Sequence, residues 1–201
     1  THGKPSKENS HPHLDNSNNF SVVHNGIIEN YNDLRKFLSD NGYIFYSQTD
    51  TEVIPNLIHY YYSKDSINDD LKVLRAVQCA CKDLKGSYAI QVLSKDLPDN
   101  MIVARKDSPL VIGKGDGENY ISSDIPAILS FTKYFYFLDD NEIALLSRDN
   151  IDFYDNNLNK LNKKVKSIDW NASAADKNGY EDYMLKEIYE QPNAIRETIG
   201  S

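Results

Sequence analysis

A change of hydrophobic period near Gly86 constrains the fold of this chain more than any other feature. Before it, apolar residues recur at helical spacing, which predicts helices after Asn30, after the Thr49–Glu52 motif and over Asp69–Leu84. After it, short β-type runs alternate with turn residues, as in antiparallel hairpins. One early strand, Phe20–His24, precedes the helices. This order predicts an α+β layered domain, not a parallel doubly wound sheet.

Three paired runs are expected in the strand-rich part, each pair separated by turn residues. They are Tyr88–Leu93 with Met101–Arg105, Tyr134–Leu138 with Glu142–Leu146, and Ile151–Tyr154 with Val165–Trp170. We also expect a β-like run at Tyr43–Tyr46 and a short helix at Ile125–Leu129. Pro192 is expected to break the terminal helical pattern, because proline removes a helical hydrogen bond.

The composition argues against several classes of protein. A chain of 201 residues is long enough for one sizeable domain, and 40% hydrophobic with 26% charged residues is typical of soluble globular proteins. The apolar runs are too short to span a membrane. A net charge of −8 argues against a nucleic-acid partner, and the lysines within 160–166 are interpreted as a solvated strand face. Two cysteines, Cys79 and Cys81, fit a reducing cytoplasm.

His24-Asn25-Gly26 is the first candidate for chemistry. An asparagine amide beside the backbone amide of a glycine offers two adjacent donors, which is what an oxyanion hole requires. We place the pair at the end of the early strand, where an ordinary Asn-Gly turn is the alternative interpretation.

Asp50 is the second candidate, because a carboxylate at a helix start can bind a ligand ammonium. Thr49-Asp50-Thr51-Glu52 matches a capping box, in which Thr49 and Glu52 bond to each other's amides.

The histidines His2, His11, His13 and His24 include a His-Pro-His pair, yet they lack a cysteine or clear carboxylate partner. We therefore expect no metal. The glycines at 113, 115 and 117 lack the Lys-Ser/Thr of a phosphate loop, and we expect no cofactor.

Several motifs resemble one family when they are taken together and in order. They are Thr1-His2-Gly3-x-Pro5-Ser6, His11-Pro12-His13, Val23–Asn30, Thr49–Ile54, Ser108–Gly113, Ser123-Asp124 and Lys186–Pro192. The whole chain resembles the class II glutamine amidotransferases, and within them the glutaminase half of the glutamine–fructose-6-phosphate aminotransferases (isomerizing). Lys186–Pro192 is the segment most specific to this member.

The resemblance implies an N-terminal-nucleophile hydrolase fold, an αββα sandwich of two antiparallel sheets between helical layers. It also implies that Asn25 and Gly26 form the oxyanion hole, that Asp50 binds the α-ammonium of glutamine, and that Thr1 and His2 lie at its α-carboxylate. Residues 1–170 are then a partial type 2 glutamine amidotransferase domain. Residues 171–201 are a linker that leads to a sugar isomerase domain, which receives the ammonia.

The family's nucleophile is an N-terminal cysteine, and this chain begins at Thr1. We therefore expect an N-terminal truncation that removes the first strands and leaves residues 1–201 inactive. The implied partners are glutamine, fructose 6-phosphate through the isomerase domain, and further copies of the chain in a homo-oligomer formed through that domain. Two alternatives stay open, namely another class II amidotransferase and a non-catalytic glutamine-binding fragment. The chain also has Asp182 where the family usually has histidine, which weakens inferences about the linker.

Overall fold

The structure is a computed structural model that describes residues 3–169 and 179–199. The chain divides into two compact units, Thr1–Ile168 and Asp169–Ser201. In the second unit the described residues form one helix, α4 (Tyr183–Ile199). Within the part of the chain that the structure describes, no helix combines the length and the apolar character needed to cross a membrane.

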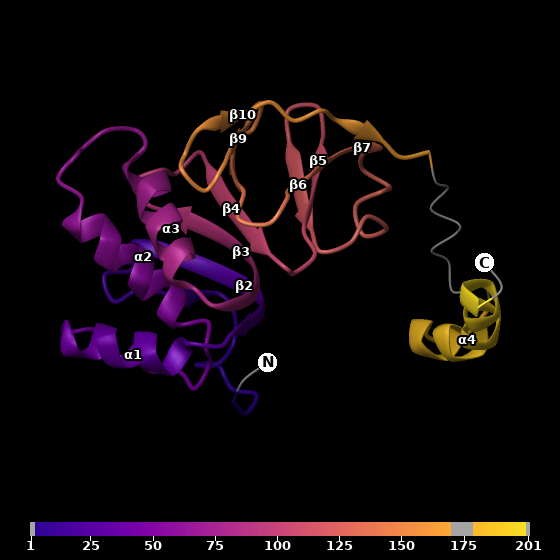
Figure 1. Cartoon of the computed structure of the whole chain (residues 1–201), viewed down its shortest axis with the longest axis horizontal. Helices are drawn as coiled ribbons and strands as arrows, with labels where there is room; N and C mark the ends of the chain where they lie inside the picture. Colours follow the sequence, from indigo (N-terminus) through magenta and orange to yellow (C-terminus); the bar gives the residue numbers. More distant parts are fainter. Residues whose placement is uncertain (1–2, 170–178, 200–201) are drawn as a thin grey trace. The chain divides into compact units, whose positions relative to one another are not determined.

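Two antiparallel sheets make up most of the first unit (Figure 1). The larger sheet has the order β1 (His13–Leu14), β2 (Phe20–Ile28), β3 (Gly86–Ser94), β4 (Met101–Lys106), β8 (Ile143–Leu146), β9 (Ile151–Tyr154), β10 (Lys160–Leu161). The smaller sheet has the order β11 (Lys166–Ser167), β7 (Tyr134–Phe137), β5 (Val111–Lys114), β6 (Asn119–Ser122). The α+β class predicted from the order of elements is confirmed.

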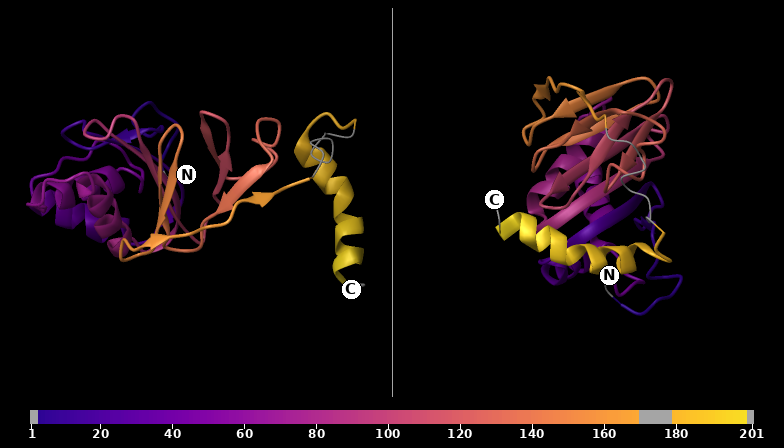
Figure 2. Two further views of the ribbon diagram at one scale, coloured as in Figure 1. Left: turned by 90° about the horizontal axis from the view of Figure 1, so that it is seen from above. Right: turned by 90° about the vertical axis from the view of Figure 1, so that its right-hand side faces the viewer.

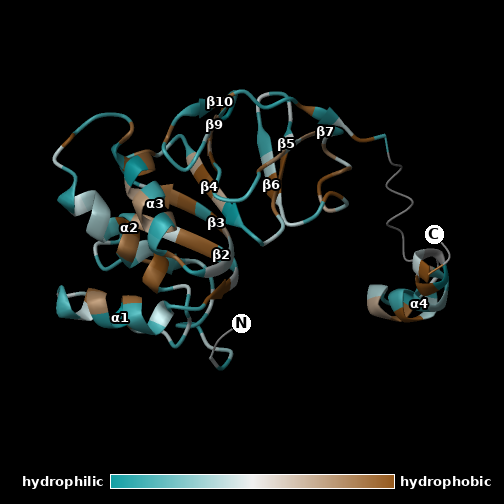
Figure 3. Ribbon diagram, viewed as in Figure 1, coloured by the Kyte–Doolittle hydropathy of each residue, from teal (hydrophilic) through white to brown (hydrophobic). Residues whose placement is uncertain are grey.

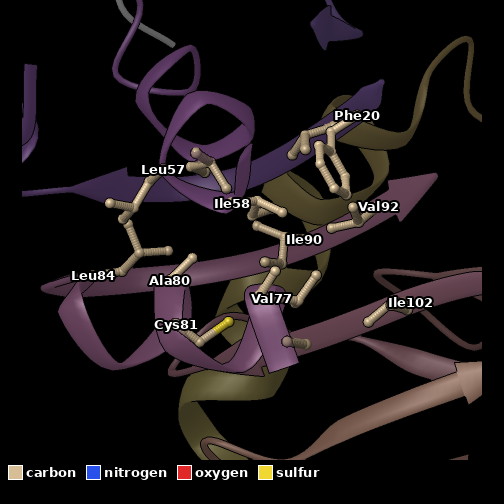
Figure 4. Packing of buried hydrophobic residues seen from close by; sticks show 14 of the residues in the cluster. Phe20, Leu57, Ile58, Val77, Ala80, Cys81, Leu84, Ile90, Val92 and Ile102 are labelled. Carbon is tan, nitrogen blue, oxygen red and sulfur yellow. The ribbon is translucent and has the colours of Figure 1, made fainter. Parts of the chain in front are cut away.

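Three helices cover one face of the larger sheet: α1 (Tyr31–Asp40), α2 (Val53–Lys64) and α3 (Lys72–Asp83) (Figure 1). Successive strand residues point to opposite faces. On β3, Ile90 therefore packs under the helices, while its neighbour Ala89 packs toward the smaller sheet. Figure 4 shows Ile90 next to Ile58 of α2, and Leu57 and Cys81 lie in the same core. Cys81 is thus the small core residue that the helical spacing predicts.

The smaller sheet packs on the opposite face of the larger one. Its residue Ile112 faces the larger sheet, whereas Val111 faces outward and is covered by Ile128 and Leu129. The layers in the first unit are therefore helices, sheet and sheet, as the left view of Figure 2 shows. In Figure 3 the strands between the layers are correspondingly apolar. This is the two-sheet arrangement predicted for an N-terminal-nucleophile hydrolase.

One of the three expected strand pairs forms, and two do not. β3 pairs with β4, as predicted. The run at 134–137 and the run at 143–146 belong to different sheets, because β7 pairs with β5 and β11 while β8 pairs with β4 and β9. The turn residues between them mark a crossing between the sheets. β9 likewise pairs with β8 and β10, not with the residues after Val165, and Trp170 lies outside the described residues.

Three further local predictions are wrong. Tyr43–Tyr46 forms no strand, because the amides of Ile44 and Tyr46 bond to side chains of Asn16 and Glu52 instead of to a neighbouring strand. Ile125–Leu129 forms turns, although the Ile128 amide donates to the Ile125 carbonyl over 3.1 Å. Pro192 lies inside α4 without ending it, so the loss of one hydrogen bond is tolerated there.

Candidate active site

Asn25 and Gly26 lie within a continuous strand and not at its end. The β2–β3 ladder runs from Phe20 opposite Ser94 to Ile28 opposite Gly86, with Asn25 opposite Ala89. The predicted end of the strand at His24 is therefore wrong. So is the interpretation of Asn-Gly as an ordinary turn, since the chain continues straight into four more paired residues after His24.

The parity of the ladder shows which way the amide of Gly26 faces. In an antiparallel strand, successive backbone amides point alternately to the two sides. Glu29 donates toward β3, to the carbonyl of Lys85. Ile28 donates to the other side, where the carboxylate of Asp50 accepts its amide over 2.8 Å. Gly26 lies two residues before Ile28 on the same strand, so its amide points to the same side as that of Ile28, toward Asp50.

Glycine is required at position 26 for two reasons. Its φ is +130°, a backbone conformation that residues with a side chain rarely adopt. A Cβ at this position would lie 2.2 Å from the carbonyl oxygen of Ser87. The side-chain amide of the neighbouring Asn25 is exposed and makes no hydrogen bond with the described residues. The strand thus presents an exposed amide side chain beside a backbone that no side chain of Gly26 shields.

The segment before α2 is held by Glu52, and the predicted capping box does not form. The carboxylate of Glu52 accepts hydrogen bonds from the amides of Tyr46 and Ser47 at 2.9 and 2.7 Å. It also accepts from the Ser47 hydroxyl over 2.6 Å and lies 3.7 Å from the guanidinium of Arg35. An irregular segment whose amides find no strand partner needs such an acceptor. Glu52 therefore serves residues 46 and 47 and not Thr49.

Asp50 lies at the tip of this segment, with 3% of its surface exposed. Its Oδ2 accepts the amide of Ile28, which joins the segment to β2. A buried carboxylate is retained in proteins where charge or hydrogen bonds compensate its desolvation. Asp50 also lines a pocket, so the charge is offered to the cavity as well as to the strand.

His24 lines the same pocket and is 5% exposed. Its Nδ1 is 3.0 Å from the Thr51 hydroxyl, and its Nε2 has no hydrogen-bond partner of acceptable geometry in the described part of the chain. Burial lowers the pKa of His24 to about 4, against the opposing effects of the Asp50 charge and the Ser87 carbonyl. The imidazole is therefore neutral near pH 7.

Two other histidines bond to threonines of the same segment. The Nε2 of His13 is 3.1 Å from the Thr49 hydroxyl, and the Nε2 of His11 is 3.4 Å from the Thr51 hydroxyl. Burial lowers the pKa of both imidazoles. Among the described residues no group of three or more histidines, cysteines or acids is arranged to hold a metal ion. Thr49 and Thr51 were not singled out from the sequence for these bonds, although their alternate spacing fits two side chains on one face.

These features meet in one pocket of about 350 Å³. Its lining residues are Asn9, Ser10, His11, His24, Asn25, Gly26, Thr49, Asp50 and Thr51. Three of the five residues predicted for the site are thus brought together by the fold. The other two, Thr1 and His2, lie outside the described residues. The pocket can offer a carboxylate at one place and amide donors at another, which suits a small zwitterionic ligand that carries a carbonyl group.

Neither cysteine belongs to the pocket lining. Cys81 is buried in the helix-side core, and burial raises the pKa of its thiol to about 12. Cys79 lies on the same helix, half-buried, and burial raises the pKa of its thiol as well. Since the thiolate is the nucleophilic form, both are poor nucleophiles at neutral pH.

Comparison with known proteins adds independent evidence. The family model described as the glutamine amidotransferase domain matches residues 4–130. Glutamine–fructose-6-phosphate aminotransferases (isomerizing) are similar along the whole chain: the protein of Clostridium perfringens is 52% identical over 201 residues and that of Methanothermobacter thermautotrophicus 46% over 199. The chain covers 32% and 33% of those two proteins, so it spans about a third of the length of the curated relatives it matches.

Two solved structures share the fold. The glutamine phosphoribosylpyrophosphate amidotransferase of B. subtilis, complexed with ADP and GMP, matches with a TM-score of 0.61 and 24% identity, over 77% of this chain and 33% of that one. A structure described as the allosteric regulatory enzyme of purine biosynthesis matches with a TM-score of 0.61 and 23% identity. At this level of identity the likeness concerns the arrangement of helices and sheets.

Proposed function

The chain belongs to the glutamine amidotransferase domain family, and from this membership we propose that its pocket binds glutamine and promotes hydrolysis of the side-chain amide. The overall reaction converts glutamine and water into glutamate and ammonia. The observation that carries the proposal is the shared side of β2. The Gly26 amide and the Asp50 carboxylate face the same side, and both line the pocket.

Asn25 and Gly26 are proposed to stabilise the oxyanion that develops on the amide carbonyl. Attack on a carboxamide places negative charge on its oxygen, and fixed donors that face that oxygen lower the barrier. The Asn25 amide is available because it is exposed and unbonded among the described residues. Gly26 permits close approach, since no side chain shields its backbone.

Asp50 is proposed to bind the α-ammonium of glutamine. A buried carboxylate attracts an ammonium more strongly than an exposed one, because solvent screening is weak there. The bond from Ile28 holds one carboxylate oxygen in place, so the group is oriented before the ligand arrives. Thr1 and His2 are proposed at the α-carboxylate, on the strength of the family motif alone.

We propose further that the chain is the glutamine-hydrolysing part of a glutamine–fructose-6-phosphate aminotransferase. Its similarity to proteins of that name, at 46–52% identity over essentially the whole chain, supports this assignment. The ammonia would then be transferred to fructose 6-phosphate to give glucosamine 6-phosphate. The isomerase part and any homo-oligomer formed through it belong to the remaining two thirds of such proteins.

We also propose that the nucleophile is not among residues 1–201. The two thiols of the chain are in α3, away from the pocket lining, and burial keeps them protonated. The described residues supply binding and charge stabilisation, and these alone do not cleave an amide without an activated nucleophile.

Ammonia and glutamate release from glutamine tests the proposal, with the complete gene product and with a polypeptide of residues 1–201. We expect steady release by the former and none by the latter. Glutamine labelled with ¹⁵N in its amide should transfer the label to fructose 6-phosphate in the complete product. Release without transfer to this sugar would favour another amidotransferase, and no binding of glutamine by the complete product would contradict the site itself.

A further inference from the structure

Two hydrogen bonds join one segment to β2 on either side of the Asn25-Gly26 pair. The Thr51 hydroxyl is 3.0 Å from His24 Nδ1, immediately before the pair. The Asp50 carboxylate accepts from Ile28, two residues after the pair. Asp50 and Thr51 are consecutive, so neighbouring residues of one segment hold both ends of a five-residue stretch of strand.

The Thr51 hydroxyl is the side-chain partner of His24 among the described residues. His24 Nε2 is buried and makes no hydrogen bond of acceptable geometry with the described residues, although the Ser87 carbonyl acts on the ring. The bond between Nδ1 and the Thr51 hydroxyl is therefore the well-formed hydrogen bond that orients the imidazole. The same hydroxyl lies 3.4 Å from His11 Nε2, and His11 lines the pocket from the loop before β1. One hydroxyl therefore contacts groups from two other segments that surround the cavity.

We propose that Thr51 is a positioning residue that fixes the distance between the donors at Asn25-Gly26 and the carboxylate of Asp50, and so selects glutamine over asparagine. This inference rests on the proposed function. Glutamine and asparagine carry the same ammonium, carboxylate and amide groups, and they differ by one methylene between them. Discrimination therefore depends on how rigidly the two anchoring points are spaced.

The size of the expected effect follows from general magnitudes. Enzymes discriminate between two substrates that differ by one methylene by about 10–200-fold in kcat/KM. Loss of one net hydrogen bond changes an equilibrium by about threefold to tenfold. Replacing Thr51 should remove part of the discrimination and not all of it, because the bond between Asp50 and Ile28 remains.

Thr51→Val and Thr51→Ser separate the hydrogen bond from the shape of the side chain. Valine keeps the size and branching of threonine but cannot bond to the imidazoles, whereas serine keeps the hydroxyl and loses the methyl. Thr132→Val is the matched control. Thr132 is 7% exposed in the smaller-sheet region, and its hydroxyl donates to the Lys114 carbonyl over 2.5 Å. That substitution removes a buried hydroxyl which does not line the pocket.

The experiment measures kcat/KM of the complete gene product for glutamine and for asparagine. The glutamine preference is the ratio of the two kcat/KM values. Where asparagine turnover is too slow to measure, the preference is taken instead as the ratio of the inhibition constant of asparagine to the KM for glutamine. We expect Thr51→Val to lower the preference for glutamine about threefold to tenfold, Thr51→Ser to restore it, and Thr132→Val to leave it unchanged. In Thr51→Val the KM for glutamine should rise and kcat should fall, since the stretch that carries Asn25 and Gly26 loses its bond at His24 and is no longer held at a fixed distance from Asp50.

Two results would overturn the inference. One is an unchanged glutamine preference in Thr51→Val, with the wild type active. The other is an equal loss in Thr132→Val, which would show that lowered stability alone explains the effect. Failure of the proposed function has a different signature, because the wild type itself would then neither bind glutamine nor release ammonia from it.

Discussion

The backbone amide of Ile28 donates a hydrogen bond to the Asp50 carboxylate, with 2.8 Å between nitrogen and oxygen. This bond joins β2 to the segment before α2, although Ile28 and Asp50 are 22 residues apart in the sequence. It holds the Asp50 carboxylate at the pocket that Asn25 and Gly26 also line. It uses one oxygen of the carboxylate. The structural role of Asp50 therefore needs an acceptor atom, while the proposed role in binding glutamine needs a negative charge.

Asp50→Asn separates these two roles. Asparagine keeps an oxygen that can accept the Ile28 amide, but it has no charge for the ligand ammonium. We expect the KM for glutamine to rise by at least tenfold with a smaller fall in kcat, because the lost charge acts mainly on binding. Steady-state kinetics of the complete gene product measure this. The melting temperature is measured beside it, and a variant that unfolds at the assay temperature, or that binds glutamine normally, would contradict the proposed role.

Asn25→Ala tests the donor in the oxyanion hole. The side-chain amide makes no hydrogen bond with the described residues, so its removal should leave the stability nearly unchanged. Turnover of glutamine should fall by about 10²–10³-fold, with a smaller change in KM, because the donor acts mainly on the transition state. Equal turnover in variant and wild type would remove Asn25 from this role. Asn32→Ala, at an exposed position in the first turn of α1, is a suitable control substitution.

Gly26→Ala should destabilise the fold through backbone strain and through overlap with β3, and Gly42→Ala is a control that has the strain without the overlap. Both glycines have positive φ, at +130° and +88°. A Cβ at Gly26 would lie 2.2 Å from the Ser87 carbonyl, whereas nothing lies within 4 Å of a Cβ at Gly42. We expect Gly42→Ala to cost about 1–2 kcal/mol from backbone strain alone. Gly26→Ala should cost at least about 3 kcal/mol, since an overlap adds to the strain.

Urea unfolding of the two glycine variants and the wild type provides the comparison. The free energies of unfolding should fall in the order wild type, Gly42→Ala, Gly26→Ala. An equal loss in both variants would show that β2 relaxes away from β3 at little cost. That result would also weaken the argument that glycine is needed beside the pocket.

The sequence predicts those parts of the fold that depend on local patterns. Helical spacing of apolar residues located α2 and α3, and the turn at Asn41-Gly42 located the end of α1, because these features are set by neighbours in the chain. The pairing of β7 and β8 was not predictable in this way. Both runs have strand composition and a turn between them, and only the packing of the two sheets decides that each belongs to a different one.

The candidate site shows the same division. Asn25, Gly26 and Asp50 were singled out from their motifs, and the fold brings all three to one pocket. The part played by Thr51 could not be predicted, since a threonine before a helix usually serves the backbone. Its partners, His11 and His24, come from two other segments, and their approach depends on how β1, β2 and α2 pack.

His24 should make the stability of the fold depend on pH. Its pKa is lowered by burial to about 4 in the folded chain, against an ordinary value near 6.5. Between these values the unfolded chain binds a proton at this residue and the folded chain does not. The free energy of unfolding therefore falls as the pH is lowered from about 6.5 to about 4, and it is unaffected by His24 above that range. The loss due to this group should be on the order of 3 kcal/mol, because the two pKa values differ by about 2.5 and each pKa unit corresponds to about 1.4 kcal/mol.

His24→Gln removes the titrating group and keeps a polar side chain that can bond to the Thr51 hydroxyl. Free energies of unfolding are compared for wild type and variant at pH 7.5, 6, 5 and 4. His11 and His13 also have pKa values lowered by burial, so both proteins should lose stability in acid. The wild type should lose more than the variant, and the difference should appear between pH 6.5 and 4. Parallel curves would show that His24 accepts a proton in the folded chain as readily as in the unfolded one, contrary to its burial against Thr51.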